Sequence, residues 1–299
     1  MLRIIDARTG EPVPAAPARR GFTRVEAHAP GRDTTGLRVL LVADVLVRTL
    51  ELGGTPVWPL LTGEGEEARK ELRADAAALG IRPFEESPGG PGRGQAIRVV
   101  RGDASASGGR VPGEGGAVRG DAAGSGGAGH GDASGVGDAG AAGDTAAGGG
   151  GPAGAASGRE PLPDAATAPT LTVAPVDPAA RDAVAGAGAD VLRLALLERH
   201  RSTPVRLDTA ALDEARATLT RLRRAVAVWA RQPSRPVPGE VRDRLRAAWE
   251  NDLDTPGLLR ELRRVETDPD LADGARFETF AYADRLLGLD LTRDLGSLV

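Results

Sequence analysis

The segment from Ser87 to Ala168 constrains the fold of this chain more than any other feature of the sequence. It consists mainly of glycine, alanine, serine, aspartate and proline, and it holds no aromatic residue. Such a segment buries too little apolar surface to offset a backbone entropy cost of about 1–2 kcal/mol per ordered residue. We therefore expect a disordered Gly/Ala-rich linker over residues 87–168, between ordered parts at 1–86 and 169–299. Within it, only Gln95 to Arg101 has the pattern of a strand.

The part before the linker alternates between strand and helix patterns. Polar and apolar residues alternate in the second strand, the third strand is apolar, and apolar or amphipathic runs closed by glycine mark the helices. The prolines of the third strand favour a position near an edge of the sheet. We expect strands at 2–5, 22–29 and 56–61 and helices at 37–52 and 65–79. Because strand, helix and strand form a βαβ unit, this part is predicted to be a truncated, Rossmann-like α/β fold.

The part after the linker has the spacing of a helical bundle. Its first helix begins near Asp190 and is apolar over much of its circumference, so we expect it to be central and buried, and to end at Ser202-Thr203-Pro204. Asp208 and Asp254 stand where they can cap later helices. About five helices are expected, which makes the fold class α/β followed by all-α. The apolar residues 171–176 are expected to pair with the N-terminal sheet, so that the two ordered parts pack together.

Composition excludes several classes of protein. The chain has no cysteine, and this excludes disulfides, thiolate zinc sites and a cysteine nucleophile. No run approaches about 18 uninterrupted apolar residues, and the N-terminus lacks a basic region followed by an apolar core. We therefore expect no membrane partner and no signal peptide, and a cytoplasmic protein is the default. The net charge of −4 gives no general attraction to nucleic acid, so we expect no DNA partner.

Two motifs of the second part carry a family resemblance. They are Asp190-Val-Leu-Arg-Leu-Ala-Leu-Leu197, followed by His200-Arg-Ser202, and Trp249-Glu-Asn-Asp-Leu-Asp-Thr-Pro256. Together they resemble the C-terminal helical domain of cysteinyl-tRNA synthetases, which are class I aminoacyl-tRNA synthetases, and they are also similar to the mycothiol cysteine ligases. The first part is similar to the opening of the same family, at residues 2–14 and in the helix of 40–53. The resemblance implies a nucleotide-binding fold followed by a bundle that touches tRNA.

One signature of that family, His-Ile-Gly-His, holds ATP phosphates at the start of the helix after the first strand. Aligned without gaps on Asp44-Val-Leu46, its four positions fall on Asp33, Thr34, Thr35 and Gly36, so neither histidine is present. We expect a helix N-cap by Thr34 or Thr35 at this place. The alternative is a weak nucleotide-phosphate site at the helix N-terminus.

The other catalytic parts of the family are missing as well. Its second signature clamps the triphosphate with lysine, but Lys70 is the only lysine of the chain and lies in an early helix. Its zinc needs cysteine and histidine ligands, and no such site can be built from His28, His130 and His200. We therefore assign no catalytic residue, no zinc and no other metal. ATP is expected as a cofactor only if the activity of the family is retained.

Arginines on the predicted bundle are the remaining candidates for function. Arg199, Arg201, Arg221 and Arg224 can contact tRNA phosphates, because guanidinium forks suit that ligand. The alternative is a solvated face on which these arginines pair with carboxylates such as Glu198.

Three functional hypotheses remain open. The first is a degenerate cysteinyl-tRNA synthetase-like protein with a tRNA- or partner-binding bundle. The second is an active ATP-dependent cysteine ligase with a rebuilt site. The third is a non-enzymatic interaction module that docks on another protein, for example a genuine synthetase.

Overall fold

The computed structural model describes residues 1–17, 21–63, 65–86, 95–102, 168–179 and 181–296. Apart from residues 95–102 and Ala168, the segment predicted to be a linker lies outside the described residues, and so does the prediction that it is disordered.

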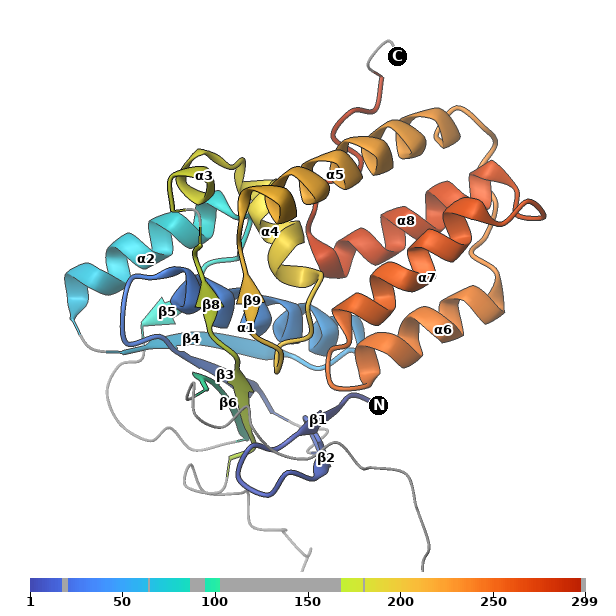
Figure 1. Ribbon diagram of the computed structural model, residues 1–299. Coiled ribbons are helices and arrows are strands. Elements are labelled where there is room, and N and C mark those ends of the chain that lie inside the picture. Colours follow the sequence, from blue (N-terminus) through green and yellow to red (C-terminus); the bar gives the residue numbers. More distant parts are fainter. Residues whose placement is uncertain (18–20, 64, 87–94, 103–167, 180, 297–299) are drawn as a thin grey trace, which may run out of the picture. The chain divides into compact units, whose positions relative to one another are not determined.

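A five-stranded parallel sheet forms the α/β part (Figure 1). Its strands are β3 (Thr23–His28), β4 (Val57–Thr62), β5 (Glu85–Glu86), β6 (Ala96–Arg101) and β7 (Thr170–Val173), in the order β5-β4-β3-β6-β7. The first strand of this sheet along the chain, β3, lies in its middle. The next two, β4 and β5, lie on one side of β3, and β6 lies on the other side. This is the doubly wound order of Rossmann-like folds, so the predicted α/β class is confirmed.

The sheet confirms two expectations about strands and refines a third. The strand predicted at Gln95–Arg101 is β6, which pairs with β3 along its length. The apolar segment predicted at 171–176 supplies β7, which pairs with β6 and so joins the second part of the chain to the sheet. The proline-containing strand β4 is second from the edge, because the two residues of β5 pair outside it.

The outer edge of β7 is covered by the N-terminal hairpin. That hairpin consists of β1 (Arg3–Ile5) and β2 (Pro12–Pro14), which pair antiparallel. The backbone N–H of Ala7 donates to the carbonyl of Thr170 at 2.7 Å, and the Asp6 carboxylate accepts from the N–H of Thr170 at 3.1 Å. A covered edge cannot pair with the strand of another chain.

Helix α1 (Thr34–Leu52) is the centre of the molecule. It is buried on nearly every side, as its apolar sequence predicts, and it packs on β3, β4, β6 and β7 as well as on helices of the second part. Its N-cap is Asp33, whose carboxylate accepts from the N–H of Gly36 at 2.6 Å, so the expectation of a cap by Thr34 or Thr35 is wrong. Helix α2 (Glu66–Ala78) follows β4, packs on α1 and buries only Leu72 and Ala76.

The second part is helical, as predicted. Its helices are α3 (Arg181–Gly186), α4 (Ala189–Leu197), α5 (Thr209–Trp229), α6 (Gly239–Glu250), α7 (Thr255–Thr267) and α8 (Asp273–Leu287). The short strands β8 (Val176–Asp177) and β9 (Val205–Arg206) pair parallel beside it. The predicted caps are confirmed: Asp208 accepts from the N–H of Ala211 at 3.0 Å, and Asp254 accepts from the N–H of Gly257 at 2.8 Å.

Helix α4 ends at Leu197, earlier than the expected stop at Ser202-Thr203-Pro204. The reason is tertiary. The hydroxyl of Thr255 donates to the carbonyl of Leu197 at 2.8 Å, and the Arg38 guanidinium donates to carbonyls of the following residues. These donors replace the backbone N–H groups that another helical turn would supply.

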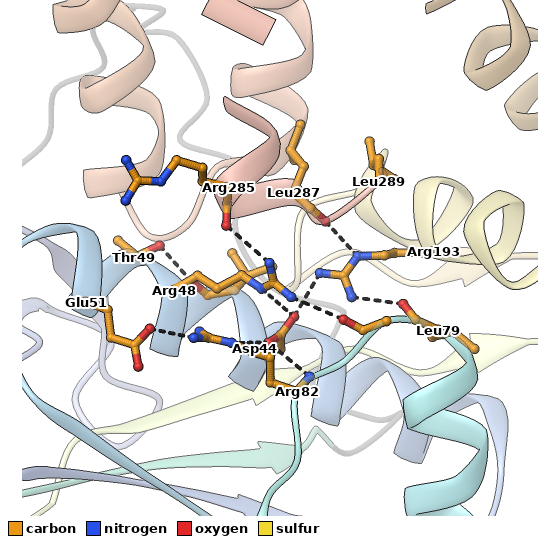
Figure 2. Close-up of polar contacts among 12 residues, drawn as sticks. Asp44, Arg48, Thr49, Glu51, Leu79, Arg82, Arg193, Arg285, Leu287 and Leu289 are labelled. Atoms are coloured by element: carbon orange, nitrogen blue, oxygen red, sulfur yellow. Dashed lines mark hydrogen bonds and ion pairs between the residues drawn. The ribbon is translucent and has the colours of Figure 1, made fainter. Parts of the chain in front are cut away.

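A buried ionic network fastens α1 to the helices around it (Figure 2). Asp44 of α1 is fully buried and accepts from Arg48 Nε at 2.9 Å, from Arg82 Nε at 3.3 Å and from Arg193 Nη2 at 2.8 Å. Arg193 comes from α4 and also donates to the carbonyl of Leu287 at the end of α8, at 2.6 Å. The network therefore joins α1, α4, α8 and the residues after α2 by ion pairs and hydrogen bonds, in addition to their apolar packing.

Candidate functional site

The sheet has a topological switch point between β3 and β6, where the chain leaves in opposite directions. In open α/β sheets, ligands bind in the crevice outside the carboxyl ends of the strands at this point. A cleft of ≈ 460 Å³ lies there. It is lined by Asp33, Thr34, Thr35, Arg101, Val176, Pro178, Val184 and Ala185. Its volume is within the range of small-molecule sites, about 300–1,000 Å³.

Three of the four residues predicted as a nucleotide site, Asp33, Thr34 and Thr35, line this crevice, and Gly36 follows them in the first turn of α1. The side chains of Asp33 and Thr35 are engaged with the protein itself. The two oxygens of Asp33 accept from the N–H of Gly36 and from Arg101 Nη1, each at 2.6 Å. The buried hydroxyl of Thr35 accepts from the N–H of Val176 at 3.0 Å. An anionic ligand at the start of α1 has to displace the Asp33 carboxylate, which already occupies the favourable end of the helix dipole.

Arg101 is a residue of this crevice that the sequence analysis missed. It stands at the carboxyl end of β6, and its guanidinium is the cation that faces Asp33. The signal that could have found Arg101 is its position in the sheet. It is the last residue of a strand that pairs with β3, the first strand of the doubly wound sheet. Using that signal requires knowing that β6 pairs with β3, which the local sequence does not say.

Gly36 is confined by a close backbone approach. A Cβ at this position would lie 2.6 Å from the carbonyl oxygen of Gly31, so a larger residue requires the loop before α1 to move. The first turn of α1 therefore fits closely against its own entry loop.

Replacing Asp33 with alanine is expected to lower the free energy of unfolding by about 1 kcal/mol, because the Gly36 N–H loses its cap. An asparagine side chain keeps an acceptor for that N–H, so Asp33→Asn should retain most of the stability while losing the ion pair to Arg101. Urea denaturation of the two variants measures the difference. Equal losses in both would assign the contribution of Asp33 to the ion pair instead of the cap.

The four arginines predicted to contact tRNA differ in their surroundings. Arg199 and Arg224 are exposed and form no ion pair with any residue in the described part of the chain. Arg221 is exposed too, but it pairs with Glu266. Arg201 is buried: its guanidinium pairs with Asp252 at 2.5 Å and donates to the carbonyl of Thr172 at 2.8 Å. Arg201 thus holds the turn before α7 against β7 and presents no charge to solvent.

Glu198 reduces the positive potential beside these arginines. It lies 3.8 Å from Arg263, and it lines a small surface hollow together with Arg221 and Arg263. Burial raises the pKa of the Glu198 carboxyl, and the neighbouring charge of Glu214 raises it further. Glu198 therefore takes up its proton at a higher pH than an ordinary glutamate, and this protonation makes that part of the bundle more positive.

The Asn251–Thr255 turn, which carries part of the family resemblance, contacts both the loop after α4 and strand β1. His200 Nε2 lies 3.1 Å from the carbonyl oxygen of Asp252, and the Asp252 carboxylate also accepts from the N–H of Ile5 at 2.8 Å. Asp252 and Leu253 have positive φ values of 53° and 58°, a strained conformation for residues with a side chain. These contacts hold the strained turn in place.

Metal and membrane features are absent from the described part of the molecule. Its histidine, aspartate and glutamate side chains form no group of three or more that could hold a metal ion. None of its helices combines the length and apolar character needed to cross a membrane.

Comparison with known proteins adds no relative: no protein-family model matches this chain, and a search of curated proteins finds no match either. The resemblance to cysteinyl-tRNA synthetases therefore rests on the sequence motifs alone.

Proposed function

We propose that this chain is a non-catalytic, cysteinyl-tRNA synthetase-like protein whose helical part binds RNA of the tRNA type. The observation that carries the proposal is the state of the crevice at the switch point. The fold provides a cleft of ligand size there, but the polar side chains of its wall are bonded within the protein. Asp33 pairs with Arg101 and caps α1, and Thr35 accepts from a backbone N–H. Phosphate chemistry needs preorganised donors that are aimed at the developing charge and not engaged by other groups of the protein. The crevice offers few, which favours a binding role over ATP-dependent ligation.

The geometry of the helical part is consistent with binding. Arg221 and Arg224 lie on α5, a helix of 21 residues that packs on α4 and α8 through its apolar side. A rigid helix that presents arginines can contact phosphates without a site built to sub-ångström tolerance. Phosphate contacts of this kind do not depend on the catalytic residues, so RNA binding can persist after those residues are lost.

An active cysteine ligase with a rebuilt site is the main alternative, and exchange chemistry separates the two. The purified protein is expected to show no cysteine-dependent exchange of pyrophosphate into ATP above the level without cysteine. Clear cysteine-dependent exchange would end the non-catalytic proposal. The cysteine-free composition gives such an activity no thiolate ligands for zinc, so added zinc is expected to change nothing.

The RNA proposal predicts that Arg221→Glu/Arg224→Glu lowers tRNA affinity at least tenfold at about 50 mM salt. Each lost phosphate contact should also flatten the plot of log affinity against log salt by about 0.7–0.9, so the double variant should lose on the order of 1.5 in slope. Filter binding over a salt series measures both quantities.

The matched control is Arg242→Glu/Arg244→Glu on α6, which packs on α7 and α8. It carries the same charge change on another exposed helix and should weaken binding less than threefold. Equal losses in the two double variants would indicate nonspecific attraction to a positive surface. If the parent protein binds no tRNA at about 50 mM salt, the RNA proposal is wrong, and a protein-interaction role for the bundle takes its place.

A further inference from the structure

A serine, a histidine and an aspartate lie in a row at the turn that follows α4. The Ser202 hydroxyl oxygen is 2.8 Å from Nδ1 of His200. The other ring nitrogen, Nε2, is 3.1 Å from the carbonyl oxygen of Asp252 and 3.4 Å from its Oδ2. His200 and Asp252 are 52 residues apart in the chain, so the fold and not a local motif makes this row. A hydroxyl, an imidazole and a carboxylate in this order are the parts of nucleophilic catalysis by serine.

The partners of the imidazole decide where its proton lies. A carbonyl oxygen can only accept, so the contact with the Asp252 carbonyl places a proton on Nε2 of His200. In the neutral ring, Nδ1 then carries the lone pair and accepts from the Ser202 hydroxyl. The backbone N–H of Ser202 reaches the same nitrogen only at 3.4 Å, so the hydroxyl is its closer donor. This is the tautomer that a general base for the serine needs.

Exposure falls along the row from the serine to the aspartate. Ser202 is exposed, the His200 side chain is 25% exposed, and Asp252 is buried. A small reagent can therefore reach the hydroxyl from solvent, whereas the carboxylate acts on the imidazole from a less polar environment. Oδ1 of Asp252 pairs with Arg201 at 2.5 Å, but its buried Oδ2 has no hydrogen-bond partner among the described residues. That oxygen is placed to stabilise the positive ring that forms when His200 takes up a proton.

We propose that Ser202 is a nucleophile toward small activated acyl esters, with His200 as its general base. Nδ1 of His200 takes the hydroxyl proton while the serine oxygen bonds to the acyl carbon. The ester C–O bond breaks, and its electron pair leaves with the alcohol or phenol oxygen, which receives the proton from Nδ1. Water then attacks the acyl-serine, its proton passes through Nδ1 to the serine oxygen, and the free acid is released. This activity needs neither ATP nor RNA, so it is independent of the proposed binding function.

Acetylation by p-nitrophenyl acetate, measured residue by residue with peptide mass spectrometry, tests the nucleophile. Ser234 is the matched serine, because it is also exposed but its hydroxyl donates to the Glu278 carboxylate at 2.6 Å instead of to an imidazole. We expect Ser202 to be acetylated at least about tenfold faster than Ser234, since a positioned general base typically contributes about 10²–10⁴-fold. His200→Gln should remove this advantage. His28→Gln, which removes another exposed imidazole, should leave it within about twofold.

Nitrogen-15 NMR spectra of the imidazoles test the arrangement without relying on reactivity. The chain has three histidines, so His28→Gln and His130→Gln identify two sets of signals and leave the third to His200. In the neutral ring of His200 we expect a proton on Nε2 and none on Nδ1. The proposal is overturned if the proton lies on Nδ1, or if Ser202 reacts no faster than Ser234. It is also overturned if His200→Gln leaves the acetylation of Ser202 unchanged.

Discussion

Replacing Asp44 with alanine is expected to lower the free energy of unfolding by about 3–5 kcal/mol, the largest effect of any single substitution considered for this chain. Asp44 is fully buried and accepts from Arg48, Arg82 and Arg193 (Figure 2). Arg193 is also fully buried. Burial lowers the pKa of its guanidinium, and the charge of Asp44 opposes that shift. Without Asp44, Arg193 remains in the core without its ion-pair partner, and only the more distant charge of Asp284 still acts on it among the described carboxylates.

Urea denaturation followed by circular dichroism measures this loss, and Asp213→Ala is the matched control. Asp213 forms an ion pair with Arg216 on the surface of α5, with 62% of its side chain exposed. Removing an exposed pair of this kind should cost less than about 1 kcal/mol. The double variant Asp44→Leu/Arg193→Leu should recover part of the stability, because it removes both buried charges. A loss below about 1 kcal/mol for Asp44→Ala would show that water enters and solvates the arginines.

Replacing Arg38 with methionine is expected to cost about 3 kcal/mol, although this arginine pairs with no carboxylate in the described residues. The side chain is 1% exposed, and its guanidinium donates to the carbonyls of Ala174, Thr203, Arg199 and His200 at 2.8–3.3 Å. Burial lowers the pKa of Arg38 to about 10, so the group is still charged at neutral pH. Methionine fills similar space and removes the donor of four carbonyls, of which only that of His200 keeps another one, the N–H of Thr203.

Arg38→Lys separates charge from geometry. It keeps a cation, but an ammonium cannot reach four carbonyls at once, so we expect an intermediate loss of stability. Arg69→Met is the control for the loss of an arginine as such, because Arg69 donates to a single carbonyl, that of Gly63, at 2.8 Å. Its cost should be below about 1 kcal/mol. Equal stabilities of Arg38→Met and Arg69→Met would contradict the role assigned to Arg38.

Local chemistry made much of this fold predictable from the sequence. A capping carboxylate acts within three residues, so Asp208 and Asp254 marked the starts of α5 and α7 correctly. Apolar periodicity acts within one or two turns, and it identified α1 as a buried helix and Gln95–Arg101 as a strand. These signals depend only on neighbouring residues, and so the sequence alone determined the types of the elements.

The tertiary structure decided which polar residues are available for function. The sequence shows Arg201 and Arg224 as two similar arginines of a helical part, yet one is buried against Asp252 and the other is exposed. It likewise shows Asp44 as one acid in an apolar helix, whereas its three arginine partners come from α1, α4 and the residues after α2.

The end of α4 and the ion pair at the crevice have the same origin, contacts between distant parts of the chain. Thr255 reaches the carbonyl of the last residue of α4 and Arg38 reaches the carbonyls after it, and Arg101 reaches Asp33 only because β6 pairs with β3. The sequence by itself determined the main helices, the strands β1, β3, β4 and β6, and the caps at Asp208 and Asp254. Only the tertiary structure decided the partners of the buried charges, because burial makes an unpaired charge costly and brings together residues that no local pattern relates.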